Sequence, residues 1–448
     1  MPPDPSGATV IVRRRSRVVT ALLHAFYDGF FLLFLLVTAP WFLVRIVRDR
    51  GLRASLAGRF GAGPRRDGGR RCIWLHGVSV GEVKAARLLV EQLVRDRPDH
   101  DLVISSTTAA GFALARRLFP AQLVIQFPLD LRWIVRRVLA RVRPDLIVLV
   151  ELEIWPNLLR EAQAQAIPVT IVNGRVSARS FRGYRLLARL LPQFELIARY
   201  AVQNDEYADR LRGLGVPDAQ ITVTGNMKYD TLRTELPAAL LDAARRELGL
   251  SAATPLVVAG STHAGEEEAL LLDLTGWRHA HPGTRLLLAP RHVERVGEVV
   301  RAIEKHGFAA ARLTELRATG RTPAADAVLV ADTIGELETF YALGRVAFVG
   351  GSLVDRGGHN MLEPAALGVP TLYGRSVHNF TEEVRLLERF DGGERVADRI
   401  ALGAAVARLL ADPAAARALG ERGRAAVASI RGGTERSRDL LLSLLDVR

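Results

Sequence analysis

Short apolar runs alternate with amphipathic segments from residue 72 to residue 350, and this alternation predicts strands and helices in turn. The first round of predicted strands is residues 72–75, Leu102–Ser105, Leu123–Phe127, Leu146–Val150, Val169–Val172 and Ile221–Thr224. The second round is Leu256–Ala259, Arg285–Ala289, Val328–Val330 and Val346–Gly350. Helix-like spacing marks Ala109–Leu118, Trp133–Val142, Glu266–Arg278, Val293–Lys305 and Gly335–Leu343. This rhythm predicts an α/β fold of two Rossmann-like domains that face a cleft, each with a doubly wound parallel sheet.

A strongly apolar stretch precedes the first round. Between Val18 and Val44 the only acidic residue is Asp28, and Gly29–Val44 carries no charge. A spanning helix needs about 20 apolar residues, so this stretch is slightly short, and Pro40 weakens it further. No small-residue cleavage site follows, which disfavours a removed signal peptide. We expect an uncleaved hydrophobic membrane-anchor helix that either spans the bilayer or lies deep in its interface.

The length of 448 residues suggests two domains of α/β size after this anchor. We place the basic anchor and its linker in residues 1–60, the first Rossmann-like domain in 61–230 and the second in 231–448. The stretch Asn226–Leu250 lies between the two rounds of strands and is the natural hinge.

Positive charge is concentrated before the first predicted strand. Residues 1–71 contain thirteen arginines and four aspartates, a local excess of nine in a chain of net charge +13. The arginines flank the apolar stretch on both sides, which favours an anionic membrane surface over nucleic acid but leaves the orientation open. The single cysteine, Cys72, excludes an intrachain disulfide and a cysteine-rich metal site.

The turn after the first predicted strand is the first candidate for chemistry. His76-Gly77-Val78-Ser79-Val80-Gly81-Glu82 joins that strand to a predicted helix. Open α/β sheets bind ligands at the carboxyl ends of their strands, so Glu82 would face the crevice from the first turn of the helix. The alternative is that Glu82 only complements the helix dipole, which is worth a few tenths to about one kcal/mol.

Two further candidates follow later strands of the first round. Glu151 and Glu153 come directly after the very apolar strand Leu146–Val150, where ionised carboxylates are rarely buried without partners. In a strand they would point to the same side. The alternative for Glu153 is that it caps a helix beginning at Pro156. Lys228, in a turn that closes the first domain, could reach a phosphate as a flexible point charge.

The second round carries a pattern typical of a nucleotide site. Gly350-Gly351-Ser352 and Gly357-Gly358-His359-Asn360-Met361-Leu362-Glu363 form a glycine-rich loop that leads into a helix, and such a loop favours phosphate. Glu363 could accept hydrogen bonds from a ribose diol. Pro290-Arg291 ends a strand, and Thr333-Ile334-Gly335-Glu336 reads as a capping box, which gives Glu336 a structural explanation.

These motifs, in this order, strongly resemble the Kdo transferases, which are GT-B glycosyltransferases that move 3-deoxy-D-manno-octulosonic acid (Kdo) from CMP-Kdo to the lipid A precursor. The resemblance runs from about Cys72 to the C-terminus and includes Glu-x-Glu-Ile-Trp-Pro-Asn, Gly-Asn-x-Lys-x-Asp, Ser-Thr-His-x-Gly-Glu-Glu and Pro-Arg-His. Met361 departs from it, because proline is expected there.

The resemblance implies that Glu82 is the catalytic base, that Glu151 and Lys228 stabilise the transition state, and that the anomeric centre is inverted. It implies that the first domain binds the lipid A precursor (lipid IVA) and the second binds CMP-Kdo. The residues implied to contact CMP are Pro290, Arg291, Ile334, Gly335, Glu336, Asn360, Met361, Leu362 and Glu363. No metal or other cofactor is expected, and the implied location is the cytoplasmic face of the bacterial inner membrane, in lipopolysaccharide biosynthesis.

Two other functions remain open at this level. One is a GT-B transferase that uses a different nucleotide sugar, which competition by CMP rather than UDP would distinguish. The other is a non-catalytic module that binds membranes or polyanions, which would keep its binding when Glu82 is replaced.

Overall fold

The computed structural model describes residues 26–29, 32–33, 36–37, 56–190 and 193–446, with the side chains of 186–190 left out. The chain divides into two compact units: residues 1–231 with 431–448, and residues 232–430. Most of the predicted anchor lies outside the described residues. Among the helices that are described, none has the length and apolarity needed to cross a membrane.

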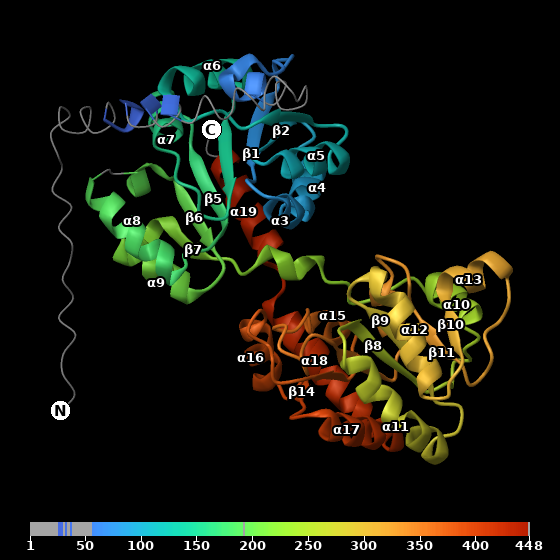
Figure 1. The fold of residues 1–448 in the computed structure, drawn as a ribbon. Coiled ribbons are helices and arrows are strands. Elements are labelled where there is room, and N and C mark those ends of the chain that lie inside the picture. The colour runs from blue at the N-terminus through green and yellow to red at the C-terminus, as the bar shows by residue number, and fades with distance from the viewer. Residues whose placement is uncertain (1–25, 30–31, 34–35, 38–55, 191–192, 447–448) are drawn as a thin grey trace, which may run out of the picture. The chain divides into compact units, whose positions relative to one another are not determined.

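The first unit is built on a seven-stranded parallel sheet in the order β3-β2-β1-β4-β5-β6-β7 (Figure 1). Its strands are β1 (Arg71–His76), β2 (His100–Ser106), β3 (Leu123–Gln126), β4 (Leu146–Val150), β5 (Val169–Gly174), β6 (Arg199–Val202) and β7 (Ile221–Val223). The helices between them are η1 (Gly58–Ala62), α3 (Val80–Ala85), α4 (Arg87–Asp96), α5 (Ala109–Leu118), α6 (Arg132–Val142), α7 (Pro156–Ala164), α8 (Ala178–Leu190), η2 (Gln193–Leu196), α9 (Asp205–Gly213), η3 (Asp218–Gln220) and η4 (Met227–Thr231).

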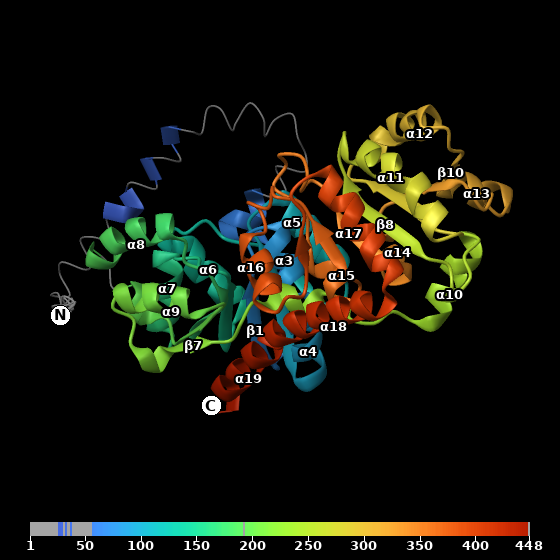
Figure 2. The ribbon, with the colours of Figure 1, turned by 90° about the horizontal axis from the view of Figure 1, so that it is seen from below.

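The second unit repeats the architecture, with strand order β10-β11-β9-β8-β12-β13-β14. Its helices are labelled in Figure 2. Its strands are β8 (Leu256–Thr262), β9 (Arg285–Pro290), β10 (Ala310–Arg312), β11 (Val328–Val330), β12 (Val346–Val349), β13 (Thr371–Tyr373) and β14 (Glu394–Arg395). Its helices are α10 (Ala238–Glu247), α11 (Glu266–Ala280), η5 (Val293–Arg295), α12 (Val296–Lys305), α13 (Leu313–Thr319), α14 (Leu337–Leu343), α15 (Leu362–Ala366), α16 (Thr381–Arg389), α17 (Arg399–Ala411) and α18 (Pro413–Ile430).

Both faces of the first sheet are buried, as a doubly wound fold requires. Alternate residues of β1 enter different cores: Trp74 packs in one, and Ile73 and Leu75 pack in the other. Each fully buried side chain of this kind stabilises the fold by roughly 1.5–3 kcal/mol. A strand buried on both sides reads as a continuous apolar run, which is why the central strand β4 matches its predicted bounds.

The short outer strands were not predicted. These are β6, β10, β13 and β14, and the last three contain only three, three and two residues. Runs this short carry no periodicity that separates a strand from a loop.

The last helix, α19 (Gly433–Asp446), belongs to the first unit, whereas the predicted second domain extended to residue 448. Its buried residues Leu441 and Leu445 complete one core of the first sheet. Asp230 fixes the start of this helix, because its carboxylate accepts the N–H groups of Gly432 and Thr434, each at 2.6 Å.

Both sheets place their candidate residues at a change of strand order. In the first sheet β1 pairs with β2 on one side and β4 on the other, and in the second β8 pairs with β9 and β12. Open α/β sheets bind ligands outside the carboxyl ends of such strands. Glu82 and Glu151 follow β1 and β4, and His263 and Gly350 follow β8 and β12.

Candidate active site

The β1–α3 turn holds Glu82 in a fixed position. Ser79 is the N-cap of α3, and its hydroxyl accepts the N–H of Glu82. The carboxylate reaches back: one oxygen accepts the N–H of Val78 at 2.7 Å, and the other accepts the Ser79 hydroxyl at 2.8 Å. The Val78 carbonyl is itself held at 3.0 Å by the hydroxyls of Ser106 and Thr108. Glu82 therefore satisfies the helix start, as the structural alternative supposed, and remains 8% exposed.

Three carboxylates and one lysine lie at the carboxyl ends of these strands, and their charges affect the pKa values of Glu82 and Glu153. Burial raises the pKa of Glu82, the hydrogen bonds from Ser79 and Val78 oppose that rise, and Glu151 and Lys228 act in opposite directions. A raised pKa makes an ionised carboxylate a stronger base, which is what a general base requires.

Glu151 and Lys228, which lie 77 positions apart in sequence, form an ion pair. Lys228 Nζ donates to Glu151 Oε1 at 2.8 Å. Glu151 has φ = 61°, so the chain leaves β4 in a turn, and the expectation that Glu151 and Glu153 extend the strand and share one side is wrong. Its N–H remains bonded to the carbonyl of Val172 on β5, which fixes this left-handed residue.

Glu153 does not cap α7. That helix begins at Pro156, its N-cap is Trp155, and no side chain caps it. Burial and the charges of Glu82 and Glu151 raise the pKa of Glu153 to about 7. Glu153 thus belongs to the same carboxylate cluster as Glu82.

Aromatic rings pack together between the end of β1 and the residue before α7. His76, the last residue of β1, stacks on Phe127 with ring centroids 3.7 Å apart, and Trp155 lies 4.9 Å from the same Phe127 ring. Burial lowers the pKa of His76 to about 3, so its ring is neutral, and its Nδ1 lies 2.9 Å from the Ser105 hydroxyl. His76 is therefore a packing residue and not an acid or base.

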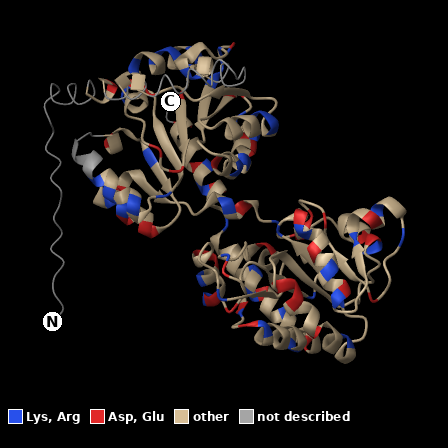
Figure 3. Ribbon diagram, viewed as in Figure 1, with Lys and Arg blue, Asp and Glu red and all other residues tan. Residues whose placement is uncertain are grey.

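The segment that follows β5 was not predicted to contribute to this site. Asn173 has φ = 55°, and its side chain accepts the N–H of Met227, which ties this segment to the turn of Lys228. Tyr184 on α8 donates to the carbonyl of Leu152 in the Glu151 turn. Four arginines of this region are exposed: Arg175, Arg179, Arg182 and Arg185. Figure 3 shows how Lys and Arg are distributed over both units. Arginine is so frequent in this chain that their spacing did not stand out.

In the second unit, four of the residues implied to contact CMP line one cavity of about 290 Å³. Pro290 and Arg291 enter it from the end of β9, and Ile334 and Gly335 from the loop before α14. Ile334 is 85% exposed, a large fraction for an apolar side chain. This cavity thus combines an exposed apolar side chain, an arginine and a glycine.

Glu336 does not complete a capping box. α14 begins at Leu337, and Glu336 is its N-cap without a side-chain cap bond, because Gly335 turns the chain with φ = 91°. Arg317 instead donates to both Glu336 oxygens, at 2.7 and 3.1 Å, and this lowers the pKa of Glu336.

The glycine-rich loop after β12 is partly occupied by a side chain of its own unit. Glu266, fully buried at the start of α11, accepts the N–H groups of Gly351, Ser352 and Leu353 at 2.7–3.0 Å. It also accepts the N–H of His263 at 2.9 Å. These N–H groups are therefore not free to bind a phosphate.

The segment from His359 to Glu363 forms the other side of this region. His359 Nε2 lies 3.0 Å from His263 Nε2, and burial lowers the pKa of His359 to about 4. Asn360 accepts the N–H of Leu362 at 3.1 Å and donates to Glu363 at 3.2 Å. Burial raises the pKa of Glu363 to about 7, and Arg291 opposes the rise, which relates this segment to the cavity above.

Met361, the departure from the expected proline, points inward. Its side chain is completely buried and lies under Gly358, which has φ = 74° and whose added Cβ would be 2.7 Å from Met361 Cε.

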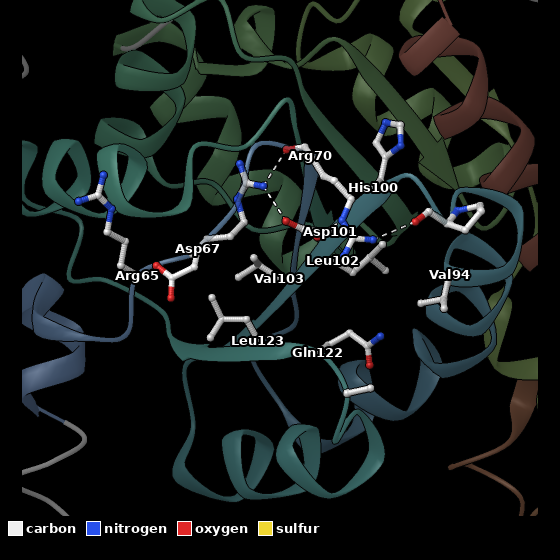
Figure 4. A pocket seen from close by; sticks show the side chains of 13 residues that line it. Arg65, Asp67, Arg70, Val94, His100, Asp101, Leu102, Val103, Gln122 and Leu123 are labelled. Carbon is white, nitrogen blue, oxygen red and sulfur yellow. Dashed lines mark hydrogen bonds and ion pairs between the residues drawn. The ribbon is translucent and has the colours of Figure 1, made fainter.

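A larger cavity, of about 540 Å³, lies at the amino ends of the strands of the first sheet, where β1, β2 and β3 begin (Figure 4). Its arginines are largely engaged with their own unit: Arg66 donates to Asp101 and to three carbonyls, and Arg70 donates to the Pro98 carbonyl. This cavity is remote from the carboxylate cluster and is not the candidate active site. Within the described ranges no group of three or more His, Cys, Asp or Glu side chains could hold a metal ion.

Comparisons with known proteins agree with these motifs. Residues 54–231 match the family model described as 3-deoxy-D-manno-octulosonic-acid transferase (kdotransferase). The 3-deoxy-D-manno-octulosonic acid transferase of Bordetella pertussis is 36% identical over 82% of this chain and 86% of its own, and that of Haemophilus influenzae is 34% identical over 93% and 98%.

Among solved structures, UDP-GlcNAc 2-epimerase from Neisseria meningitidis bound to UDP-GlcNAc is 13% identical, with a TM-score of 0.52 over 84% of this chain and 100% of that one. This likeness concerns the fold alone and agrees with the GT-B arrangement of two Rossmann-like units. The sequence relatives carry the family assignment: this chain belongs to the 3-deoxy-D-manno-octulosonic acid transferase family of glycosyltransferases.

Proposed function

We propose that this chain transfers Kdo from CMP-Kdo to the lipid A precursor lipid IVA, with inversion of the anomeric centre, in lipopolysaccharide biosynthesis. The observation that carries the proposal is Glu82. In this chain the Glu82 carboxylate lies where the strand order of the first sheet changes. Both of its oxygens accept hydrogen bonds within the turn, and the charges of one lysine and two further carboxylates act on this group of side chains.

In the proposed reaction Glu82 is the general base. It removes the proton of an acceptor sugar hydroxyl while that oxygen bonds to the anomeric carbon of Kdo. The bond from this carbon to the phosphate of CMP breaks, and CMP leaves with the electron pair. Each Glu82 oxygen accepts one hydrogen bond in the turn and keeps a lone pair for the proton. General base catalysis supplies about 10²–10⁴-fold, so positioning and electrostatics provide the rest.

Glu151 and Lys228 act on the charges of the transition state. Lys228 uses one of its three N–H donors on Glu151 and keeps the others for the oxygens of the departing phosphate. The negative charge of Glu151 orients Lys228 and stabilises positive character on an oxocarbenium-like sugar. Each role depends on the other, because the pair is a single hydrogen-bonded unit.

CMP binds on the second unit. Arg291, Ile334 and Gly335 contact the nucleotide in their shared cavity, with Pro290 and Glu336 beside them. Asn360 and the backbone of Met361 and Leu362 contact the phosphate and ribose, and Glu363 accepts hydrogen bonds from the ribose diol. The reaction as proposed uses no metal ion, since the charges it needs are those of protein side chains.

The acceptor is a phosphorylated, acylated lipid, which accounts for the basic and apolar character of residues 1–60. We place the enzyme on the cytoplasmic face of the inner membrane. The exposed arginines that follow β5 attract the phosphates of the acceptor, because they lie beside the turn that carries Glu151. Removing residues 1–50 should reduce turnover of membrane-embedded acceptor more than turnover of detergent-dispersed acceptor, and equal losses would contradict this role.

The decisive experiment is turnover of CMP-Kdo, generated in situ, with a tetraacylated lipid A precursor. Wild type, Glu82→Ala and Glu82→Gln are compared, with Glu91→Gln as a control because Glu91 is an exposed residue on α4. The proposal expects product from wild type and the control, near-complete loss in both Glu82 variants, and unchanged CMP binding in all four proteins. Active Glu82 variants would show that the base lies elsewhere, and an inactive wild type that binds CMP would redirect the search to other sugars and acceptors.

A further inference from the structure

Three histidines gather at the carboxyl ends of strands in the second unit. His263 directly follows β8, His292 lies two residues after β9, and His359 lies in the loop that follows β12. The rings of His263 and His359 are parallel within 1°, and their Nε2 atoms lie 3.0 Å apart. The His292 ring lies edge-on to His263, with ring centroids 5.9 Å apart. We call these three residues the histidine cluster.

The histidine cluster adjoins the residues assigned to CMP. His292 lines the same cavity as Arg291, together with Ser261 near the end of β8. His359 directly precedes Asn360, which is also assigned to the nucleotide. The cluster is therefore connected both to the nucleotide cavity and to the segment that carries Asn360.

The backbone around His263 and His359 holds this pair in place. The N–H of His263 donates to Glu266 at 2.9 Å, and the same carboxylate accepts the N–H of Gly351 at 2.7 Å. Gly351 has φ = 68°, and a Cβ added there would lie 3.0 Å from His359 and 3.3 Å from His263. Glycine leaves room for both rings, and their packing against it fixes the position of the pair.

The pair can offer one hydrogen-bond donor and one acceptor to a ligand. Burial lowers the pKa of His263 and lowers that of His359 to about 4, so both rings are neutral at neutral pH. In a neutral pair the N–H of one Nε2 donates to the other Nε2, and whichever ring donates, one Nδ1–H donor and one Nδ1 acceptor remain. Among the described residues neither Nδ1 has a hydrogen-bond partner. A carboxylate can accept from this donor, and a sugar hydroxyl can donate to this acceptor.

Arginine side chains lie close enough to act on both rings. Arg356 and Arg295 lower the pKa of His263, and Arg291 lowers that of His359. Arg291 and Arg356 are exposed, and within the described ranges neither forms an ion pair with a carboxylate. Their guanidinium groups are therefore available to an anionic ligand.

The acids near the pair are mostly engaged. Glu267 forms an ion pair with Arg295 at 2.9 Å, and Glu266 accepts four backbone N–H groups. Arg291 lowers the pKa of Glu363, but the two form no ion pair in the described part of the chain. The excess of positive charge beside the pair favours an anion.

The donor in the proposed function carries two anionic groups at one carbon. Kdo is a 2-keto sugar acid, so its anomeric carbon bears a carboxylate, and in CMP-Kdo the same carbon is bonded to an oxygen of the phosphate. A site for this donor therefore needs a position for a carboxylate next to the position for the phosphate. A neutral sugar on a nucleotide has no such group.

We propose that His263 and His359 bind this carboxylate, with Arg356 supplying positive charge, and that the pair thereby selects a donor whose sugar is an acid. This inference rests on the proposed function, which assigns residues to the nucleotide and gives the histidines no role. The alternative is that the pair only holds the glycine-rich loop, and it predicts different binding constants.

Donor kinetics and CMP binding, measured on the same variants, separate these two roles. Full-length His263→Gln and His359→Gln are compared with wild type and with His279→Gln, the control, because His279 is an exposed residue of α11. We expect the KM for CMP-Kdo, generated in situ, to rise roughly 10–100-fold in both variants, because a hydrogen bond to a charged group is lost. The Kd for CMP, which lacks the carboxylate, should stay within about twofold of wild type. Equal weakening of CMP and donor would show that the pair only holds the loop and would overturn the inference.

Arg356→Gln tests the same assignment without changing the pair. The side chain is exposed, so this variant should fold normally. The lost charge should raise the KM for CMP-Kdo about three- to tenfold and leave the Kd for CMP unchanged. A KM that is unchanged in all three variants would overturn the inference.

Binding of the free sugar tests the inference without turnover. Kdo and its methyl ester differ in the negative charge of the carboxylate, and each is titrated into the CMP-saturated protein and followed by NMR. Wild type and His279→Gln should prefer the acid, and His359→Gln should bind acid and ester alike. Equal binding of acid and ester by wild type would overturn the inference. A wild type that prefers the acid but turns over no CMP-Kdo would contradict the proposed function and support the carboxylate site.

Discussion

Glu82 and Glu266 occupy corresponding places in the two units, and their surroundings give them different tasks. Each lies at the start of the helix that follows a central strand, beside a change of strand order. Glu82 accepts two hydrogen bonds from its own turn and is partly exposed beside other charges. Glu266 is completely buried and accepts four backbone N–H groups, three of them from a distant loop. A carboxylate with spare lone pairs can take a proton, whereas a saturated one holds a loop.

Replacement of Glu82 should have the largest effect, and that effect should be on rate. We expect Glu82→Gln to lower kcat by about 10²–10⁴-fold, because the amide cannot accept the proton. The free energy of unfolding should change by about 1 kcal/mol or less, since the amide can still bond within the turn. Steady-state kinetics and chemical denaturation of the same preparation measure the two quantities. A large loss of stability with kcat retained would reverse the contrast with Glu266.

Replacement of Glu266 should act on stability and on nucleotide binding. A glutamine has one acceptor oxygen, so its NH₂ group would face two of the four N–H groups that the carboxylate now accepts. Each unsatisfied buried group costs about 1–3 kcal/mol, which gives a loss of roughly 2–6 kcal/mol in the second unit.

Denaturation of Glu266→Gln, with CMP titration at a temperature where the protein remains folded, measures this loss. The control is Glu268→Gln, because Glu268 is exposed on the same helix and its ion pair with Lys305 is long, at 3.8 Å. We expect weaker CMP binding only in the Glu266 variant. A Glu266→Gln protein as stable as wild type would show that the loop does not depend on this carboxylate.

This contrast also shows what the sequence could and could not predict. Glu82 became a candidate because it follows a strand and a glycine-containing turn, and the resemblance then implied its role as a base. The central strands were identified because burial on both faces makes them continuously apolar. Glu266 appeared only within the Ser-Thr-His-x-Gly-Glu-Glu motif and was given no role, because nothing in the sequence links it to Gly351. Long-range partners of this kind, including Arg317 with Glu336, depend on how loops meet after folding.

Local rules failed where the backbone departs from regular geometry. The period of two residues placed Glu151 and Glu153 on one side of a strand, but Glu151 is left-handed and the strand has ended. The Thr333-x-x-Glu336 pattern satisfied the capping-box rule, but Gly335 turns the chain and the helix starts after it. Both places lie in the proposed site, where a tertiary contact outweighs local preference.

Lys228 should give a smaller effect than either glutamate. Its ion pair with Glu151 is partly exposed, and such pairs contribute about 0–1 kcal/mol to stability, so Lys228→Ala should fold normally. A charge-assisted hydrogen bond to a leaving phosphate is worth about 1.5–3 kcal/mol, which predicts a kcat lower by roughly 10–150-fold.

Two companion variants test how Lys228 acts. Lys228→Arg should recover part of the rate, because it restores the charge but not the point geometry. The double variant with Glu151→Gln should lose less than the sum of the single losses in activation free energy, because the two side chains act as one unit. Additive losses would mean that Lys228 and Glu151 act independently.

The smallest expected effect is a pH dependence of CMP binding that comes from Glu363. Burial raises its pKa to about 7, so the carboxyl is largely protonated below pH 7 and ionised above it. The ionised form accepts stronger hydrogen bonds from a ribose diol, by about 1 kcal/mol, so CMP should bind roughly five- to tenfold more tightly as the pH rises through 7. Titration calorimetry between pH 5.5 and 8.5 measures this slope.

Glu363→Gln should bind CMP with the weaker affinity at every pH and remove the slope attributed to residue 363. Glu336→Gln should retain the slope, because Arg317 keeps the pKa of Glu336 low. A slope that persists in Glu363→Gln would assign the titration to another group.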